Sequence, residues 1–270
     1  MIKKITLFFA ILLCISIQAQ TYKRVVSLAP SLTQSIYFMG AQDKLIGCTS
    51  YCEAAKADKK TIVASAVKPN LEKIISLKPD LVLASGFTNP EDIATLRKFG
   101  IRVEMFPSPK SFDDICRQFT DLGKTIGKAR EAEKIVSDSR KKIVDIQNRR
   151  KGKSQLKMFF QIGANPLFTV IPNTFMDDYM KFLGAENIAK DLKRGSVSRE
   201  FVIAKNPDYI FIVTMGIVGE EEKNVWGKYS NLAAARKKQI HIIDSEIACQ
   251  PTPITFAQTM EVLDELVNKN

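Results

Sequence analysis

The chain has 270 residues, of which 45% are hydrophobic and 26% charged, and its formal net charge is +11. This composition is ordinary for a globular protein, and the length allows two lobes with adequate cores. The Lys and Arg residues are dispersed and no aromatic–basic motif accompanies them, which argues against a nucleic-acid partner. The charge favours a solvated basic surface first, and an anionic ligand or membrane surface second.

The first residues are typical of a signal peptide. Lys3 and Lys4 supply a positive region, and the apolar stretch at residues 5–17 is too short to cross a bilayer as a helix of the mature protein. We therefore expect residues 1–20 to be removed, with cleavage near Ala19. The mature protein is expected to be soluble and exported to the periplasm.

The cysteines leave several pairings open. Cys14 follows Leu13, where a lipid-attachment motif needs a small residue, so lipid anchoring at Cys14 is not expected. Removal of the leader leaves Cys48, Cys52, Cys116 and Cys249. In an oxidising compartment these permit two disulfides in three connectivities, a pair between Cys52 and Cys249 among them. Zinc ligation is disfavoured because C-x-x-C pairs are absent and the chain has one histidine.

The first part of the mature chain alternates expected strands and helices. The expected strands are residues 24–28, 44–47, 81–84 and 101–106. The expected helices are residues 33–39, a short helix led by Glu72, and residues 93–99. Alternation with short connections predicts a parallel α/β sheet, so residues 21–126 are expected to form an N-terminal α/β lobe.

A long amphipathic helix is expected in the middle of the chain. Ser111 followed by Asp114 resembles a capping box. After Gly127, apolar residues recur at helical spacing up to Arg150 without a proline or a glycine. Residues 127–153 are therefore expected to form a stiff helix between two lobes that move little relative to each other.

The last part of the chain repeats the order of the first. The expected strands are residues 156–162, 209–214 and 239–244, and the expected helices are 175–183, a short helix led by Glu200, and 254–268. Residues 154–270 should thus form a C-terminal α/β lobe. The predicted fold is two Rossmann-like α/β lobes with parallel sheets, joined by a single long backbone helix.

One pattern occurs in both halves. Glu72 precedes the dipeptide Pro79-Asp80 by seven residues, and Glu200 precedes Pro207-Asp208 by the same distance. Each Pro-Asp opens an apolar run. Two lobes that each present one acidic residue in the same way suit docking onto a partner with two-fold symmetry.

Ligands of open parallel sheets bind beyond the carboxyl ends of the strands. The loops expected there carry small, polar and aromatic residues, which suit a sizeable ligand held by van der Waals contact and a few hydrogen bonds. For any single loop, ordinary turn chemistry or core packing is the competing explanation. The candidate ligand-binding residues are Pro30, Ser31, Ser50, Tyr51, Cys52, Gly86, Phe87, Asn165, Phe168, Met215 and Gln250.

Signatures of catalysis are absent from the sequence: it has no G-x-S-x-G, H-E-x-x-H, P-loop or G-x-G-x-x-G motif. His241 alternates with isoleucines on an expected strand, which favours a structural role. Trp226 is expected on the surface of its lobe, and the three glutamates at 220–222 in a solvated loop. An exported α/β enzyme that uses Asp or Glu is a remote alternative, and no resident cofactor or metal is expected.

Six segments carry a family resemblance that spans nearly all of the mature chain. They are residues 27–31 (Ser-Leu-Ala-Pro-Ser), 47–51 (Gly-x-Thr-Ser-Tyr), 70–82 (Asn-Leu-Glu to Pro-Asp-Leu-Val), 160–169, 184–191 and 197–200 (Val-Ser-Arg-Glu). Together they resemble the class III, helical-backbone solute-binding proteins of ABC importers. The resemblance implies a non-enzymatic monomer that captures a metal-chelate small molecule and delivers it to an ABC permease dimer.

The resemblance also assigns roles to residues. It implies that Glu72 and Glu200 form salt bridges with arginine pockets of the permease dimer, one from each lobe. It points first to cobalamin or a related corrinoid, and second to haem or a ferric siderophore. The cobalamin-binding members carry tryptophans where this chain has Ala66 and residues 193–196, and Asp-Tyr-Pro where it has residues 53–55. Loss of these aromatic groups leaves the identity of the chelate open.

Overall fold

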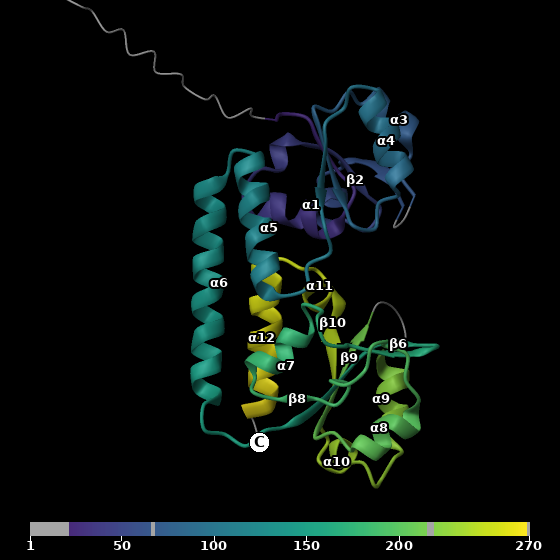
Figure 1. Ribbon diagram of the computed structural model, residues 1–270, viewed down its shortest axis with the longest axis vertical. Coiled ribbons are helices and arrows are strands. Elements are labelled where there is room, and N and C mark those ends of the chain that lie inside the picture. Colours follow the sequence, from purple (N-terminus) through teal and green to yellow (C-terminus); the bar gives the residue numbers. More distant parts are fainter. Residues whose placement is uncertain (1–21, 66–67, 215–218, 269–270) are drawn as a thin grey trace, which may run out of the picture.

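The computed structural model describes residues 22–65, 68–214 and 219–268. The expected signal peptide, Ala66 and the candidate ligand residue Met215 lie outside these ranges. Figure 1 shows two α/β lobes, one above the other, with the long helix α6 (Ala129–Arg150) running beside both. The predicted α/β class, with two lobes and a long helix between them, is confirmed.

The described strands of the N-terminal lobe form a parallel sheet in the order β3-β2-β1-β4-β5. They are β1 (Val25–Ser27), β2 (Leu45–Thr49), β3 (Thr61–Ala64), β4 (Leu81–Ser85) and β5 (Val103–Phe106). The helices are α1 (Pro30–Phe38), the 3-10 helix η1 (Gln42–Lys44), α2 (Glu53–Ala57), α3 (Leu71–Ser76) and α4 (Pro90–Lys98). The sequence predicted no strand at β3, because four residues are too few for periodicity to separate a strand from a loop.

The C-terminal lobe contains a mixed sheet in the order β10-β9-β6-β7, with β8 also paired to β6. Its strands are β6 (Lys157–Ala164), β7 (Leu167–Thr169), β8 (Glu186–Asn187), β9 (Tyr209–Thr214) and β10 (Ile240–Asp244). The pairs β10–β9, β9–β6 and β6–β8 are parallel as predicted, and the short strand β7, which was not predicted, adds one antiparallel pair with β6. Two residues connect these strands, and a connection that short can only form an antiparallel hairpin.

The helices of the C-terminal lobe cover this sheet. They are α7 (Asp177–Phe182), α8 (Arg199–Lys205), α9 (Gly219–Gly227), α10 (Ala233–Arg236), α11 (Ser245–Ala248) and α12 (Pro253–Asn268). Strand β9 and the end of α12 lie where the sequence predicted them. The short elements β7, β8, α9, α10 and α11 were not predicted, since none offers a long enough periodic pattern.

A second helix, α5 (Phe112–Thr125), accompanies α6 between the lobes. Phe112 and Ile115 of α5 belong to the core of the C-terminal lobe, whereas Phe119 and Leu122 belong to the core of the N-terminal lobe. Figure 1 shows α6 beside α5 in its upper half and beside α12 in its lower half. The helical backbone therefore includes α5 as well as the predicted helix, and both helices bury apolar residues in the two cores.

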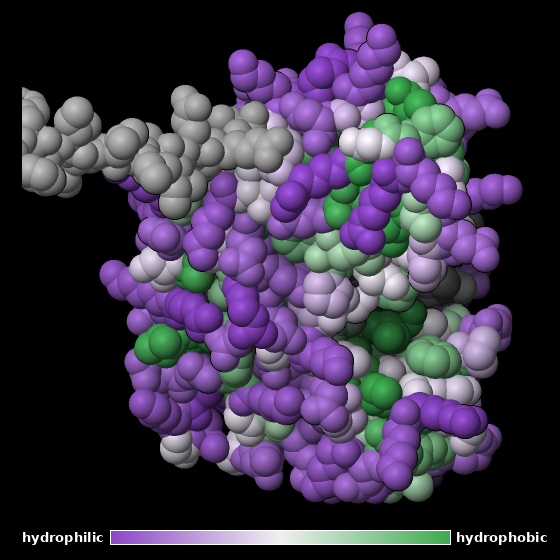
Figure 2. Space-filling model, turned by 45° about the horizontal axis from the view of Figure 1, so that its top comes forward, coloured by the Kyte–Doolittle hydropathy of each residue, from purple (hydrophilic) through white to green (hydrophobic). Residues whose placement is uncertain are grey.

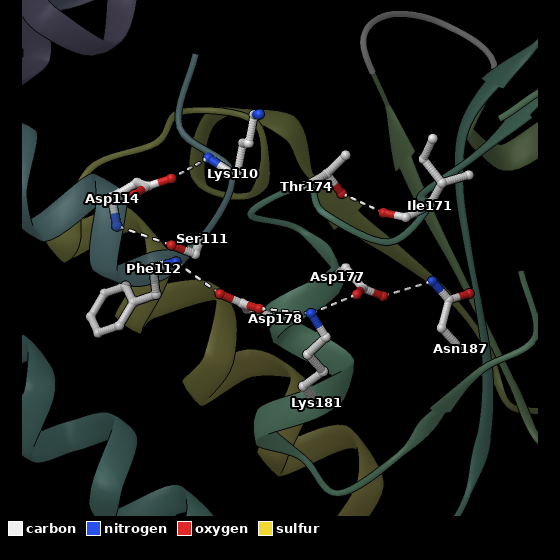
Figure 3. Close-up of polar contacts among 10 residues, drawn as sticks. All are labelled: Lys110, Ser111, Phe112, Asp114, Ile171, Thr174, Asp177, Asp178, Lys181 and Asn187. Atoms are coloured by element: carbon white, nitrogen blue, oxygen red, sulfur yellow. Dashed lines mark hydrogen bonds and ion pairs between the residues drawn. The ribbon is translucent and has the colours of Figure 1, made fainter. Parts of the chain in front are cut away.

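Buried polar contacts fix the start of α5 to the C-terminal lobe (Figure 3). The N–H of Asp114 donates to Ser111 Oγ over 3.1 Å, which confirms the predicted cap. The N–H of Phe112 donates to Asp178 Oδ2 of α7 over 2.9 Å, and Lys181 Nζ lies 3.3 Å from the other oxygen of Asp178. A carboxylate at a helix N-terminus satisfies an unpaired N–H and complements the helix dipole. The segment that leaves the N-terminal lobe is thus held by a side chain of the other lobe.

The repeated Pro-Asp turn has a structural role in each lobe. The carboxylate of Asp80 accepts the backbone N–H groups of Lys23 and Arg24 over 2.7 and 3.0 Å, just before β1. The carboxylate of Asp208 accepts the N–H of Lys157 over 3.0 Å, at the start of β6. In both copies the aspartate joins the start of its own strand to that of the neighbouring strand. The repeat is therefore a duplication of structure as well as of sequence.

Candidate ligand cleft and docking sites

The described candidate ligand residues lie close after strands of both sheets, most of them on loops. Pro30 and Ser31 begin helix α1, and Phe168 lies in strand β7. Figure 1 shows helix α11, which directly follows β10, where the two lobes meet. Figure 2 shows a hollow between the upper and lower halves, with hydrophobic residues gathered around it. Among the candidates, Gly86 and Asn165 are exposed, whereas Pro30, Ser31, Ser50 and Gln250 are half-buried. The hollow between the lobes is the candidate ligand cleft.

Three aromatic residues among the candidates are exposed to solvent, two on loops and Phe168 in strand β7. Phe87 is 81% exposed, Tyr51 is 59% exposed and Phe168 is 40% exposed. The first two belong to the N-terminal lobe and the third to the C-terminal lobe. Large apolar side chains that remain in water at one place in a fold are informative, because folding would otherwise bury them. These three rings are exposed apolar surface contributed by both lobes.

Cys52 occupies a different position from its neighbours on the same loop. It is buried, and its sulfur lies 3.3 Å from Thr33 Oγ1 and 3.2 Å from Thr49 Oγ1. The side chain of Tyr51 is directed outward while that of Cys52 packs in the core of the lobe. Cys52 therefore anchors the loop to the core of its lobe.

The position of Phe168 depends on a glycine in the next segment. The N–H of Thr169 donates to the carbonyl of Gly195 over 2.8 Å, and Phe168 forms a β-bridge with Ser196. A Cβ at position 195 would lie 2.6 Å from Phe168 Cε1 and 2.7 Å from the carbonyl oxygen of Thr169. Only glycine allows the ring to lie against this backbone.

A small hollow of about 20 Å³ lies beside Phe87 at the carboxyl ends of β1, β3 and β4. Its lining includes the hydroxyl residues Ser65, Ser85 and Thr88, and Lys68 supplies a positive charge. The volume is close to that of one water molecule. It can accept a small polar substituent of a ligand, while the body of a large ligand needs the cleft between the lobes.

A buried polar network joins β6, α8 and α9 in the C-terminal lobe. Arg199 Nη2 donates to both carboxylate oxygens of Glu222 over 2.7 and 2.8 Å. Gln161 Nε2 donates to Glu222 Oε2 over 2.7 Å, and Trp226 Nε1 donates to Gln161 Oε1 over 2.7 Å. The Arg199 guanidinium also stacks on the Trp226 ring, 4.7 Å from its centroid. Arg199 reaches both oxygens through Nη2 alone, and its buried Nη1 has no hydrogen-bond partner among the described residues. The charge-assisted pair and the added hydrogen bonds link α8, α9 and β6.

This network corrects two sequence predictions. Trp226 is fully buried, not on the lobe surface. The glutamates at 220–222 begin helix α9, and Glu222 is buried in the network instead of lying in a solvated loop. Gly219, Glu222 and Trp226 are the buried residues of α9, at helical spacing of three and four. Because three glutamates stand in a row at 220–222, the sequence does not show that only Glu222 shares the buried face of α9.

The two candidate docking glutamates occupy equivalent positions. Glu72 is the second residue of α3, whose cap Asn70 accepts the N–H of Lys73 over 2.9 Å. Glu200 is the second residue of α8, whose cap Ser198 accepts the N–H of Phe201 over 3.3 Å. Both glutamates are exposed.

Figure 1 shows α3 in the upper lobe and α8 in the lower lobe, both on the side away from α6. Hydrogen bonds from its own backbone N–H and from Ser198 lower the pKa of Glu200 below its ordinary value. Glu200 therefore stays ionised near neutral pH. Glu72 and Glu200 thus place an exposed carboxylate at the same position of an equivalent short helix in each lobe.

The described ranges contain no group of three His, Cys, Asp or Glu side chains placed to hold a metal ion. No helix within these ranges is long and apolar enough to cross a membrane. His241 is half-buried, with Nε2 2.8 Å from Gln239 Oε1 and its ring stacked on Tyr209 and Phe211. Burial lowers its pKa. These contacts fit the structural role predicted for this histidine.

The sequence profile of the family described as periplasmic binding protein matches residues 25–247. The chain belongs to this family. This periplasmic binding protein is of class III, and solute-binding members of the family are not enzymes. An uncharacterized ABC transporter substrate-binding lipoprotein of Bacillus subtilis, YvrC, is 29% identical over 255 residues, covering 90% of this chain and 80% of the relative. A vitamin B12-binding protein of Vibrio vulnificus is 28% identical over 263 residues, covering 96% and 95%.

Solved structures agree with the fold of this binding protein. The vitamin B12-binding protein BtuF of Vibrio cholerae superposes with a TM-score of 0.78 at 25% identity, over 92% of this chain and 97% of that chain. The haem-binding protein HutB of the same species has a TM-score of 0.81 at 19% identity, over 90% and 98%. The second likeness concerns the fold alone. The binding protein is thus an exported, extracytoplasmic substrate-binding protein of an ABC transporter.

Sequence reasoning missed three residues that shape these sites. Lys68 was passed over because a single lysine in a basic chain carries no signal. Gly195 precedes an expected helix and belongs to no motif. An isolated glycine is only a weak sign that two backbone segments approach closely. In the sequence Arg199 stands out only as the neighbour of Glu200, since its partner Glu222 lies 23 residues farther along the chain.

Proposed function

We propose that this binding protein captures a metal-chelate small molecule in the periplasm, cobalamin or a related corrinoid first, and delivers it to an ABC permease dimer. The observation that carries the proposal is the exposure of Tyr51, Phe87 and Phe168 around the cleft, with both lobes contributing. Exposed aromatic rings on the two lobes can both contact a large planar ligand, and the burial of apolar surface on both sides of that ligand favours binding. The vitamin B12-binding relatives support a corrinoid as the first choice.

Haem or a ferric siderophore is the second candidate within the same class of function. Lys68 beside Phe87 and the net charge of +11 favour a chelate that carries acidic groups. The positions where the cobalamin-binding members carry tryptophan are also occupied by other residues here.

The test of the proposal is a panel of chelates offered to the purified exported chain. Cobalamin, haem and ferric siderophores are each added, excess ligand is removed by gel filtration, and the retained absorbance is recorded. Isothermal calorimetry then gives the affinity and stoichiometry. Retained corrin bands support the first candidate, and a Soret band or a siderophore charge-transfer band supports the second. If no chelate is retained, the proposal is wrong.

The proposed delivery step uses Glu72 and Glu200. Each is exposed at the first turn of its helix, and an exposed carboxylate can accept a bidentate pair from an arginine of the permease. The two equivalent positions suit a dimer whose two subunits present the same surface.

The proposed organisation follows the sequence boundaries. Residues 21–126 and 154–270 are the lobes, residues 127–153 are the connecting helix, and the mature chain acts as a monomer. The proposal includes removal of residues 1–20 and no lipid at Cys14. Because the Bacillus subtilis relative is named a lipoprotein, the intact mass of the mature protein is the direct test of this point.

A further inference from the structure

Two buried cysteines enclose the loop that carries Tyr51. Cys48 lies in β2, and Cys52 directly precedes α2. Both belong to the core cluster of the N-terminal lobe that packs against α1. Neither the proposed ligand contacts nor the proposed docking step uses their thiols. In the structure both cysteines are free thiols.

The thiols of Cys48 and Cys52 are neighbours. Both side chains are buried in the same core cluster, and the Cys52 sulfur is in contact with the hydroxyls of Thr33 and Thr49. The N–H of Cys52 donates to the carbonyl of Thr49 over 3.3 Å, which closes a turn and keeps the two cysteines close. Two cysteines that are buried in one cluster and flank a single turn need only a local movement to bring their sulfurs to the S–S bond length of about 2 Å.

The two thiols differ in acidity. Hydrogen bonds from Cys48, Thr33 and Thr49 hold the pKa of Cys52 below its ordinary value. The pairing with Cys52, together with burial, raises the pKa of Cys48. Because the thiolate is the nucleophile in thiol–disulfide exchange, Cys52 is the more reactive of the two where a local opening of the loop admits an oxidant.

We propose that Cys48 and Cys52 form a disulfide that fixes the base of the Tyr51 loop in the exported protein, with a thiol–disulfide oxidoreductase of the exported compartment as oxidant. The Cys52 thiolate attacks the disulfide of the oxidant, forms a mixed disulfide and releases one thiolate of the oxidant. Cys48 then gives up its proton, attacks the Cys52 sulfur and releases the second thiolate. The two cysteines lose two electrons and two protons, and the disulfide of the oxidant becomes a dithiol.

Burial determines when this exchange takes place. Both sulfurs are shielded in the folded lobe, so the reaction belongs to folding after export or to a local opening of the loop. Three residues separate the two cysteines, so the pair can meet before the rest of the lobe has folded.

The remaining two cysteines lie in other surroundings. Cys116 is buried in α5 and Cys249 packs against the core of the C-terminal lobe. Burial raises the pKa of both thiols. The Cys52 thiol is directed into the core of its own lobe, toward Thr33. The structure therefore favours the pair Cys48–Cys52 over the pair Cys52–Cys249.

A thiol map tests the proposal without reference to any ligand. The full chain is exported by a host with an oxidising periplasm, quenched in acid, and alkylated with N-ethylmaleimide in denaturant without reductant. We expect Cys116 and Cys249 to be alkylated and Cys48 and Cys52 to appear in one cross-linked peptide. Cys48→Ser should expose Cys52 to alkylation and leave the other two unchanged. Alkylation of both Cys48 and Cys52 in the wild-type chain, or a cross-link from Cys52 to Cys249, overturns the proposal.

A second measurement covers the case in which the serine variant folds poorly. Dithiothreitol should lower the Tm of the wild-type chain by about 5 °C, as expected for opening a short disulfide loop. Amide hydrogen exchange across residues 49–52 should become faster at the same time. The variant with both Cys48→Ser and Cys52→Ser should show neither response. If dithiothreitol changes neither the Tm nor the amide exchange of the wild-type chain, the proposed Cys48–Cys52 disulfide is contradicted.

Discussion

Replacing Glu222 with alanine removes the centre of the polar network in the C-terminal lobe. The carboxylate accepts two hydrogen bonds from Arg199 and one from Gln161, all within 2.8 Å. The variant leaves a guanidinium on the Trp226 ring with its charge unpaired. The perturbation therefore combines a lost ion pair with the loss of the shorter of two hydrogen bonds that Gln161 Nε2 donates, the other going to the carbonyl of Gly163 over 3.3 Å.

The expected loss can be worked from burial. Removing one partner of a fully buried ion pair costs roughly 3–5 kcal/mol. The side chain of Arg199 is 25% exposed and that of Glu222 is 10% exposed, so water screens part of the unpaired charge. The loss in the free energy of unfolding should therefore be about 2–3 kcal/mol. Glu222→Gln keeps the shape and some of the hydrogen bonds, and should cost about half as much.

Urea unfolding followed by fluorescence measures this loss directly. Trp226 is the single tryptophan of the chain, and it is buried and hydrogen-bonded to Gln161, so its emission reports on the network itself. Glu221→Ala is the matched control, because Glu221 lies on the same turn and is exposed. The control should change stability by less than about 0.5 kcal/mol. If Glu222→Ala also lost less than about 0.5 kcal/mol, the network would contribute no more than a surface ion pair, and the reasoning would be refuted.

Two further predictions concern the cleft and the backbone. Gly195→Ala places a Cβ 2.6 Å from the Phe168 ring, so the ring must move and calorimetry should show ligand affinity reduced by about tenfold. The control Gly227→Ala, whose Cβ has no neighbour within 4 Å, should bind the ligand normally. Equal ligand affinities of the two variants would contradict the role of Gly195. Asp178→Ala removes the acceptor of the Phe112 N–H at the start of α5 and should lower the free energy of unfolding by about 1–2 kcal/mol in urea titrations; an unchanged midpoint would show that the other cap at this helix start is sufficient.

The sequence predicted those parts of the fold that long periodic patterns encode. Helix α6 begins two residues after the start of the expected range 127–153 and ends at Arg150, where the apolar pattern also ends, because its apolar stripe continues over 22 residues. Strand β9 has the predicted bounds, since a Pro-Asp turn precedes a fully apolar run. The three loop aromatics were singled out by their position after strands, and the structure leaves them exposed.

Features that depend on tertiary contacts could not be read from the sequence. Asp178 and Phe112 are 66 residues apart, and no local pattern shows that one caps the helix of the other. Strand β7 has three residues and its hairpin is recognisable only from the two-residue connection. Trp226 was placed at the surface because its neighbours are polar, whereas a partner 65 residues away satisfies its N–H in the core.

The most direct test of the central claim is the association of the chelate-loaded protein with its permease reconstituted in nanodiscs. Glu72→Ala combined with Glu200→Ala should leave chelate affinity unchanged, because both side chains are exposed at the first turns of α3 and α8. The same variant should lose at least tenfold in affinity for the permease and should abolish uptake. The matched control replaces Glu220 and Glu221, which are also exposed carboxylates of the C-terminal lobe. Wild-type permease affinity and uptake in the Glu72 and Glu200 variant would contradict the account.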